Sequence, residues 1–235
     1  MSTPASEGLI LTRGDDYLVA LKPAGLATTG RTLDDPDCLQ GQLMWHLKRR
    51  KVWAVHQLDK GTSGLCLFAL RKPSVSLWAE RLRAGRKVYL GLVDGALAGT
   101  HEVHEPIGRV TLPDGRTQAG LVKDGKTAHS TVRALGTAGG RTVVAVEIHT
   151  GRTHQVRLHL GHLGHPLVGE RMHRTPPCTA MAFVALHGWL VSLQGPDAAT
   201  MRWEAPVPEA LARAVEAAGL ALPSPKAVGM WDDHE

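Results

Sequence analysis

The sequence predicts an α+β fold, in which a mixed, largely antiparallel β-sheet is flanked by helices. Two observations support this prediction. Short apolar runs of the kind that form strands outnumber segments with helical spacing, and several of these runs are joined by turns of only a few residues. Short connections favour antiparallel neighbours, because parallel strands need a long crossover. Apolar residues make up 43% of the 235 positions, which is enough to bury a core.

The first elements are a hairpin and a helix. Residues 9–11 and 17–21 are apolar runs on either side of the turn-forming residues 13–16, so we expect two paired strands there. Residues 39–48 place leucines at helical spacing and end in a basic residue, as the last turn of a helix often does. This pattern predicts an amphipathic helix.

The next elements surround a polar loop. Residues 52–58 and 65–70 are expected to form buried strands, and residues 59–64 between them are polar and contain two glycines. A helix is expected over residues 73–83, because a proline suits its first turn and a glycine follows it as a stop.

The middle of the chain combines strands with a region of weak pattern. Residues 88–93 are expected to form a strand. Residues 96–124 are rich in Gly, Pro and His with little periodicity, so we expect an irregular, solvent-facing insertion. Strands are expected again at residues 127–135 and 142–149, joined by the glycine-rich residues 136–140.

The last elements return to helix and strand. Residues 154–163 have helical spacing, residues 186–193 and 200–203 resemble a strand pair, and residues 209–218 form an alanine-rich amphipathic pattern that predicts a final helix.

Composition narrows the class of protein. We expect one domain over residues 1–220 and a loose tail at residues 221–235. The formal net charge of +5 favours polyanionic partners such as nucleic acid, although each cluster of Lys and Arg is also typical of a solvated helix face. Three widely spaced cysteines suggest no disulfide framework. The N-terminus lacks the pattern of a secretory signal, and no window is apolar enough to span a membrane. We therefore expect a cytoplasmic monomer with no membrane partner.

Two patterns suggest ligands that the surrounding sequence argues against. Residues 120–127 match a phosphate-binding loop, but such a loop must follow a buried strand and open a helix, and the residues after it are strand-like. Six of the 13 histidines lie within residues 149–173, yet none shows the H-E-x-x-H spacing of a zinc site, and His154 and His159 lie on different helix faces. We therefore expect neither a bound nucleotide nor a metal site in these segments.

Two segments carry candidate functional residues. Asp59 follows an apolar strand, enters a Thr-Ser-Gly turn and has Lys60 beside it, which suits either a nucleophile or base above a pocket or an aspartate that stabilises its own turn. Residues 150–159 place two arginines, a histidine and a glutamine at the start of a helix. This start suits either an anion-binding site or a capped helix with surface arginines.

These segments, taken in order, resemble the RluA-type pseudouridine synthase family. The matching landmarks are residues 21–26, 56–65, 87–95 and 150–169, with a closing match at residues 186–188 and 205–208. The resemblance covers about residues 8–211. It implies the catalytic fold of this family, a basic cleft, and no metal or organic cofactor. As a departure from the family, we expect no separate RNA-binding domain before Gly8.

The resemblance also implies site residues. Asp59 attacks or otherwise activates the nucleoside, Tyr89 packs on the target base, and Arg157 pairs with the Asp59 carboxylate. By the same resemblance, further residues are expected to bind substrate. These are Lys22, His56, Gln57, Thr62, Ser63, Arg152, His154 and Gln155.

The chain departs from the family pattern at three places. Gln57 stands where the family usually has an Arg that helps to displace the target base, and Gln supplies neither its charge nor its stacking plane. Glu170 stands where Asp is common, and Met172-His173 where Tyr-Gly is common.

The sequence therefore predicts an isomerase that converts uridine to pseudouridine in structured tRNA or rRNA. Gln57 also suggests an alternative, a non-catalytic RNA-binding module that keeps the fold. Retention of Asp59, Tyr89 and Arg157 argues for the enzyme.

Overall fold

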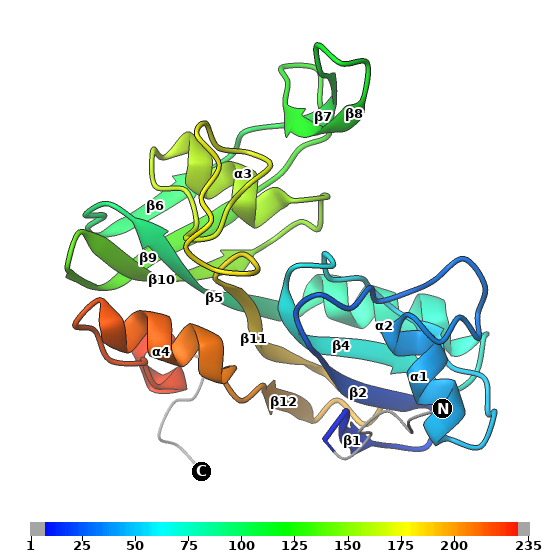
Figure 1. Ribbon diagram of the computed structural model, residues 1–235. Coiled ribbons are helices and arrows are strands. Elements are labelled where there is room, and N and C mark those ends of the chain that lie inside the picture. The colour runs from blue at the N-terminus through cyan, green and yellow to red at the C-terminus, as the bar shows by residue number, and fades with distance from the viewer. Residues whose placement is uncertain (1–7, 230–235) are drawn as a thin grey trace. The chain divides into compact units, whose positions relative to one another are not determined.

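The computed structural model describes residues 8–229, and these residues form two compact units (Figure 1). The first unit comprises residues up to Gly85 together with Gly188–Pro206, and the second comprises Arg86–His187 together with the residues from Val207 on. The expected lack of a secretory signal concerns residues that lie largely outside the described part. The prediction of one domain over residues 1–220 stays a prediction.

The first unit is built on antiparallel strands. In the strand order, β1 lies beside β2, β2 beside β4, and β4 beside β11, with β3 also paired to β4 and β12 to β11. The strands are β1 (Ile10–Arg13), β2 (Tyr17–Lys22), β3 (Trp53–Ala54), β4 (Ser63–Ala69), β11 (Leu186–Gln194) and β12 (Thr200–Glu204).

Two helices complete this unit. Helix α2 (Ser74–Ala84) buries Trp78 and Leu82 against apolar side chains of β2, β4 and β11. Tyr17 at the start of β2 adds an aromatic contact, with its ring centroid 4.8 Å from that of Trp78. Helix α1 (Leu39–His46) buries its leucines, and the thiol of Cys38 accepts a hydrogen bond from the backbone of its first turn. Both helices were expected at these positions.

The second unit contains an antiparallel sheet in the order β5-β10-β9-β6. Its strands are β5 (Arg86–Asp94), β6 (Thr100–Val103), β9 (Ser130–Ala138) and β10 (Arg141–Ile148). Helix α3 (Gln155–His162) packs Val156 and Leu160 against one face of this sheet, on buried valines of β9 and β10. Helix α4 (Glu209–Ala217) lies near β5 on the other side (Figure 1).

Three expectations about secondary structure are wrong in detail. Residues 96–124 are not irregular, since they contain β6 and a separate hairpin of β7 (Ile107–Thr111) and β8 (Thr117–Leu121). Their polar composition hid these strands because they lie at an edge or outside the main sheet, where few positions are buried. The strand expected over residues 52–58 is limited to β3. The tail that was expected to be loose, residues 221–235, contains a short helix, η1 (Pro225–Val228), which buries Val228.

The phosphate-loop pattern lacks the structural context that such a loop needs. Residues 120–127 continue from the hairpin strand β8 into a turn, and Lys126 then pairs with Ile107 through backbone hydrogen bonds. A strand, not a helix, follows this segment. The prediction that these residues do not form a phosphate-binding loop is therefore supported.

Candidate active site

Asp59 lies in a loop that the first unit holds rigidly from both sides. Before Asp59, the Thr28 hydroxyl accepts a hydrogen bond from the backbone N–H of Leu58 (3.1 Å) and donates one to the Leu58 carbonyl (2.9 Å). After Asp59, the backbone N–H of Gly25 donates to the Lys60 carbonyl at 2.7 Å. Asp59 is half-buried, while Lys60 is exposed. The loop therefore presents one carboxylate from a fixed backbone.

Lys22 supports this loop from within the fold. Its ammonium donates to the carbonyls of Pro23 (3.0 Å), Leu26 (2.7 Å) and Lys60 (3.2 Å), and its side chain is almost fully buried. Burial lowers the pKa of Lys22 to about 8, although the nearby Cys66 and Asp59 act to raise it. The expectation that Lys22 binds substrate is not supported by this position. Lys22 holds the Asp59 loop in place.

Gly64 ends the loop where only a glycine fits. Its φ is +127°, and a Cβ atom there would lie 2.2 Å from the carbonyl oxygen of Gly188. The neighbouring Thr62 and Ser63 are also buried. The Thr62 hydroxyl is one of the few buried polar atoms among residues 8–229 with no hydrogen-bond partner. Because an unsatisfied buried hydroxyl is costly, Thr62 is a candidate to gain a partner when substrate binds.

His56 and Gln57 precede Asp59 and differ in exposure. His56 accepts the backbone N–H of Leu67 on its Nε2 at 3.1 Å, which places the ring proton of the neutral form on Nδ1. Gln57 is exposed. Gln57 is thus accessible for contact with RNA, whereas Nε2 of His56 already accepts a hydrogen bond from the backbone of β4.

Tyr89 and Arg157 belong to the second unit. Tyr89 lies in β5, partly buried against the apolar cluster that α3 covers. Arg157 lies in α3, where its Nε and Nη2 donate to the two carboxylate oxygens of Glu170, each at 2.8 Å. This pair is buried, with 1% of the Glu170 side chain exposed. The pair fixes the direction of the guanidinium.

Glu170 is held as firmly as the arginine that it binds. Its Oε1 also accepts the backbone N–H groups of Met172 (2.8 Å) and His173 (3.1 Å). Burial alone would raise the pKa of Glu170, but the hydrogen bonds and charge of Arg157, with these two N–H groups, lower it to about 2. Glu170 therefore supplies a buried, charged carboxylate at the position where Asp is common in the family.

The start of α3 is closed by its own side chains. The Gln155 carboxamide oxygen accepts the Thr150 hydroxyl (2.8 Å) and the Arg152 backbone N–H (3.0 Å), while its nitrogen donates to the His129 carbonyl and the Ser130 hydroxyl, both at 2.9 Å. Gln155 is buried. These contacts favour the capped-helix alternative and do not support the expectation that Gln155 binds substrate.

Two further predicted residues lie at the same helix start. Arg152 donates through Nε to the Thr127 carbonyl at 2.9 Å. His154 has φ +57°, in the left-handed region that a non-glycine residue rarely adopts, and its Nδ1 lies 2.7 Å from Nε2 of His173. Burial, with the charge of Arg157, lowers the pKa of His173 to about 4. Such strained positions concentrate at functional sites.

The remaining clustered histidines have partners within the protein. His159 is fully buried, with Nδ1 3.0 Å from the Ser130 hydroxyl and Nε2 3.0 Å from the Glu105 carbonyl. His162 lies 3.6 Å from the Glu105 carboxylate, and His165 contacts the Asp94 carbonyl. None of these three belongs to a group of three or more metal-ligating side chains among residues 8–229.

One group of such side chains does exist among residues 8–229, and no pattern in the sequence indicates it. Glu102, His129 and His149 offer ligand atoms within 4.8 Å of one another. They are separated by 27 and 20 positions and come together only through strand pairing, so no spacing rule reveals them. In the sequence, Glu170 is only a departure from the family pattern, and its ion pair with Arg157 becomes evident in the structure.

Comparison with known families agrees with the resemblance in the sequence. Residues 16–162, more than half of the chain, match the model of a family described as RNA pseudouridylate synthase. The chain belongs to this family. The match includes Asp59, Tyr89 and Arg157.

Individual relatives in the family cover most of this chain. The Nitrosomonas europaea protein named "Ribosomal large subunit pseudouridine synthase D" is 35% identical over 219 residues, which cover 86% of this chain and 63% of the relative. The protein of the same name from Pseudomonas aeruginosa is 31% identical over 220 residues, covering 85% of this chain and 68% of the relative. The chain thus spans less than two thirds of the first of these relatives.

Solved structures show the same fold. The structure titled "Human RNA Pseudouridylate Synthase Domain Containing 4" matches with a TM-score of 0.73 at 20% identity, over 92% of this chain and 94% of the other. The domain-containing 1 protein matches with a TM-score of 0.70 at 24% identity, over 92% and 96%. The α+β prediction is therefore confirmed. Within the described residues, every helix is too short or too polar to cross a bilayer.

Proposed function

We propose that this protein is an RNA pseudouridine synthase, which isomerises specific uridines in structured RNA with Asp59 as its catalytic carboxylate. The observation that carries this proposal is the Asp59 loop. A half-buried carboxylate stands at the point where the backbone is held by Lys22, Gly25 and Thr28, in a chain of the matching family. A reactive group gains most when its supporting residues fix its position in advance.

The conversion of uridine to pseudouridine is an isomerisation, so the site needs no second reactant. The C–N glycosidic bond of uridine breaks, the uracil turns, and a C–C bond forms at C5, which loses its proton while N1 gains one. Substrate and product have the same atoms. The detached base must be kept in place during the turn, so a site with a carboxylate, an aromatic side chain and a fixed cation meets the need.

We assign two further roles from the family pattern. Tyr89 serves as the aromatic platform for the base, and Arg157 as the cation that pairs with the Asp59 carboxylate. The bidentate contact with Glu170 supports the role of Arg157, because it orients the guanidinium through Nε and Nη2. Glu170 is then a positioning residue, which acts through Arg157.

The first unit has surface features that suit an RNA partner. Trp45, at the end of α1, is 57% exposed, and the guanidinium of Arg49 lies 4.4 Å from the centre of its ring. An exposed aromatic ring beside a basic run offers both stacking for a base and charge for the phosphates. Since two relatives are named for the large ribosomal subunit, rRNA is the first substrate to test, with tRNA as the second. We infer that the enzyme acts alone in the cytoplasm as a monomer.

The test is conversion of uridine in purified total bacterial RNA, read as reverse-transcription stops after carbodiimide treatment. We expect new pseudouridine with the wild-type protein and none with Asp59→Asn, which removes the charge and keeps the side-chain size. Asp124→Asn, at an exposed turn position, is the matched control and should be fully active. Filter binding should show similar RNA affinity for all three proteins.

Two outcomes would contradict the proposal. If the wild-type protein binds RNA but makes no pseudouridine in either tRNA or rRNA, the protein is the non-catalytic binding module that Gln57 suggests. If Asp59→Asn converts uridine as fast as Asp124→Asn does, the enzyme works without the Asp59 carboxylate and its assignment is wrong.

A further inference from the structure

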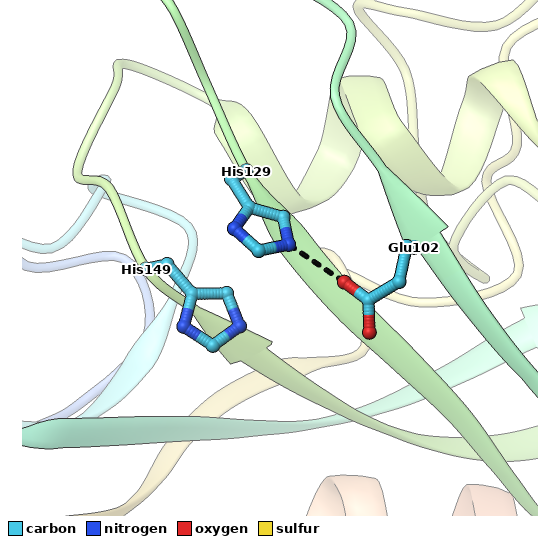
Figure 2. Close-up of side chains that lie close together, drawn as sticks. All are labelled: Glu102, His129 and His149. Carbon is cyan, nitrogen blue, oxygen red and sulfur yellow. Dashed lines mark hydrogen bonds and ion pairs between the residues drawn. The ribbon is translucent and has the colours of Figure 1, made fainter.

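Three side chains of the second unit converge on one point of its sheet. Glu102 lies in β6, His129 directly precedes β9, and His149 directly follows β10. Their ligand atoms lie within 4.8 Å of one another, and they are the only such group of metal-ligating side chains that residues 8–229 contain. Figure 2 shows the two imidazole rings side by side, with Nε2 of His129 pointing to the Glu102 carboxylate.

Backbone pairing brings these side chains together. Glu102 lies directly opposite Thr131 across β6 and β9, and Thr131 lies opposite Glu147 across β9 and β10. The backbone N–H of His149 donates to the His129 carbonyl at 3.0 Å, which extends the pairing by one step. Because side chains alternate between the faces of a strand, all three ligands project from the same face. Their proximity follows from the register of three strands.

The contacts within the cluster aim the polar atoms at a common point. Glu102 Oε2 lies 2.6 Å from Nε2 of His129 and accepts the Thr131 hydroxyl at 3.0 Å. The same hydroxyl oxygen lies 2.8 Å from Nε2 of His149. The rings of His129 and His149 are stacked, with centroids 4.2 Å apart. Nε2 of His129 therefore contacts the Glu102 carboxylate directly, and Nε2 of His149 is linked to it through the Thr131 hydroxyl.

We propose that Glu102, His129 and His149 bind a divalent transition-metal ion of the zinc class. Two imidazole nitrogens and one carboxylate oxygen are a common ligand set for Zn²⁺, which leaves a fourth position to water. Ligand atoms around tetrahedral zinc lie about 3.3 Å apart. The distances in the cluster lie on both sides of this value, so rotations of partly exposed side chains suffice to enclose an ion. The ion replaces the proton that joins His129 to Glu102.

The position of the site argues for a structural role. The residues that alternate with the ligands, Ser130, Val132 and Val146, point to the face that α3 covers. The ion would lie on the opposite face, away from Arg157. It would tie β6, the last strand of the sheet, to β9 and β10. The His129 carbonyl also accepts from Gln155, so the ion would stabilise the strands that anchor the start of α3.

The test uses full-length protein without a histidine tag, stripped with EDTA and then desalted. Calorimetric titration with ZnCl₂ should show one equivalent bound per chain, and the melting temperature should rise when ZnCl₂ is added. His149→Ala and Glu102→Gln should each lower the affinity at least about tenfold and abolish the thermal shift. His46→Ala removes an exposed histidine of the first unit and should bind as the wild type does.

Two results would overturn the proposal. One is the absence of saturable zinc binding, which would show that the cluster is held by its hydrogen bonds alone. The other is an affinity of Glu102→Gln equal to that of His46→Ala, which would place any bound zinc elsewhere. Circular dichroism of each apo variant will show whether it is folded. If His149→Ala does not fold, the comparison of Glu102→Gln with the wild type still tests the proposal. Neither readout depends on catalytic activity.

Discussion

Replacing Glu170 with Gln tests how the arginine of α3 is held. The substitution keeps the size of the side chain but removes the negative charge that binds Arg157 through two hydrogen bonds of 2.8 Å. It also weakens the acceptor for the backbone N–H groups of Met172 and His173. Because the Glu170 side chain is 1% exposed, water cannot replace the lost contacts.

The expected loss of stability follows from two independent magnitudes. The pKa of Glu170 falls from its ordinary value of 4.5 to about 2, which corresponds to about 3 kcal/mol of preference for the charged carboxylate. Removing one partner of a buried ion pair costs about 3–5 kcal/mol in other proteins. We therefore expect Glu170→Gln to lower the free energy of unfolding at pH 7 by about 3 kcal/mol.

The assay is denaturation by urea at several pH values, with Glu147→Gln as the control. Glu147 forms a similar bidentate pair with Arg86, but that arginine side chain is 43% exposed, so we expect a loss below about 1 kcal/mol. Since the pKa of Glu170 is lowered in the folded state, its contribution is complete above pH 4.5 and disappears as the pH falls towards 2. The difference between wild type and Glu170→Gln should shrink over that interval.

Two observations would refute this reasoning. A loss for Glu170→Gln no larger than that for Glu147→Gln would mean that the buried pair adds nothing to stability beyond a surface pair. A difference that stays constant from pH 7 to pH 2 would mean that the loss comes from packing, since most of the stability that depends on the carboxylate charge is lost by the lower end.

Three further substitutions test the Asp59 loop. Gly64→Ala should destabilise the protein by at least about 2 kcal/mol in urea denaturation, because its Cβ would meet the Gly188 carbonyl at 2.2 Å; near-wild-type stability would contradict this. Lys22→Met should lower kcat for pseudouridine formation and lower the free energy of unfolding by about 1–3 kcal/mol, since the carbonyls that hold the loop lose their donor; an unchanged kcat would show that the loop is held without it. Gln57→Arg should tighten RNA binding up to about fivefold and make it more dependent on salt, and an unchanged salt dependence would place Gln57 away from the RNA.

The sequence predicts best those features that adjacent residues determine. Pro73 and Gly85 mark the start and the end of one predicted helix, and the structure confirms α2 between them. The Asp59 loop is similar, because its glycine, its turn and its carboxylate lie within six positions. The sequence does not predict the hairpin β7–β8, because each of its strands buries only one residue and so shows no regular alternation of apolar side chains.

Burial separates the predicted site residues in a way that residue type cannot. Lys22 and Gln155 have side chains that commonly bind phosphate or bases, yet both form hydrogen bonds with backbone groups inside the fold. Gln57 has the weaker chemistry but is exposed. A family motif thus includes residues whose polar groups are engaged within the fold, and only their hydrogen-bond partners identify them.

The same limit explains why the proposed metal site was not expected from thirteen histidines. Spacing rules detect ligands that share a helix or a turn, as in H-E-x-x-H. Glu102, His129 and His149 share neither, and their meeting depends on the register of β6 with β9 and of β9 with β10. A shift of one residue in either pairing would turn a ligand to the opposite face, where α3 packs. Zinc binding by these three side chains is therefore also a test of the strand register in the second unit, since a different register would leave no ligand set to find.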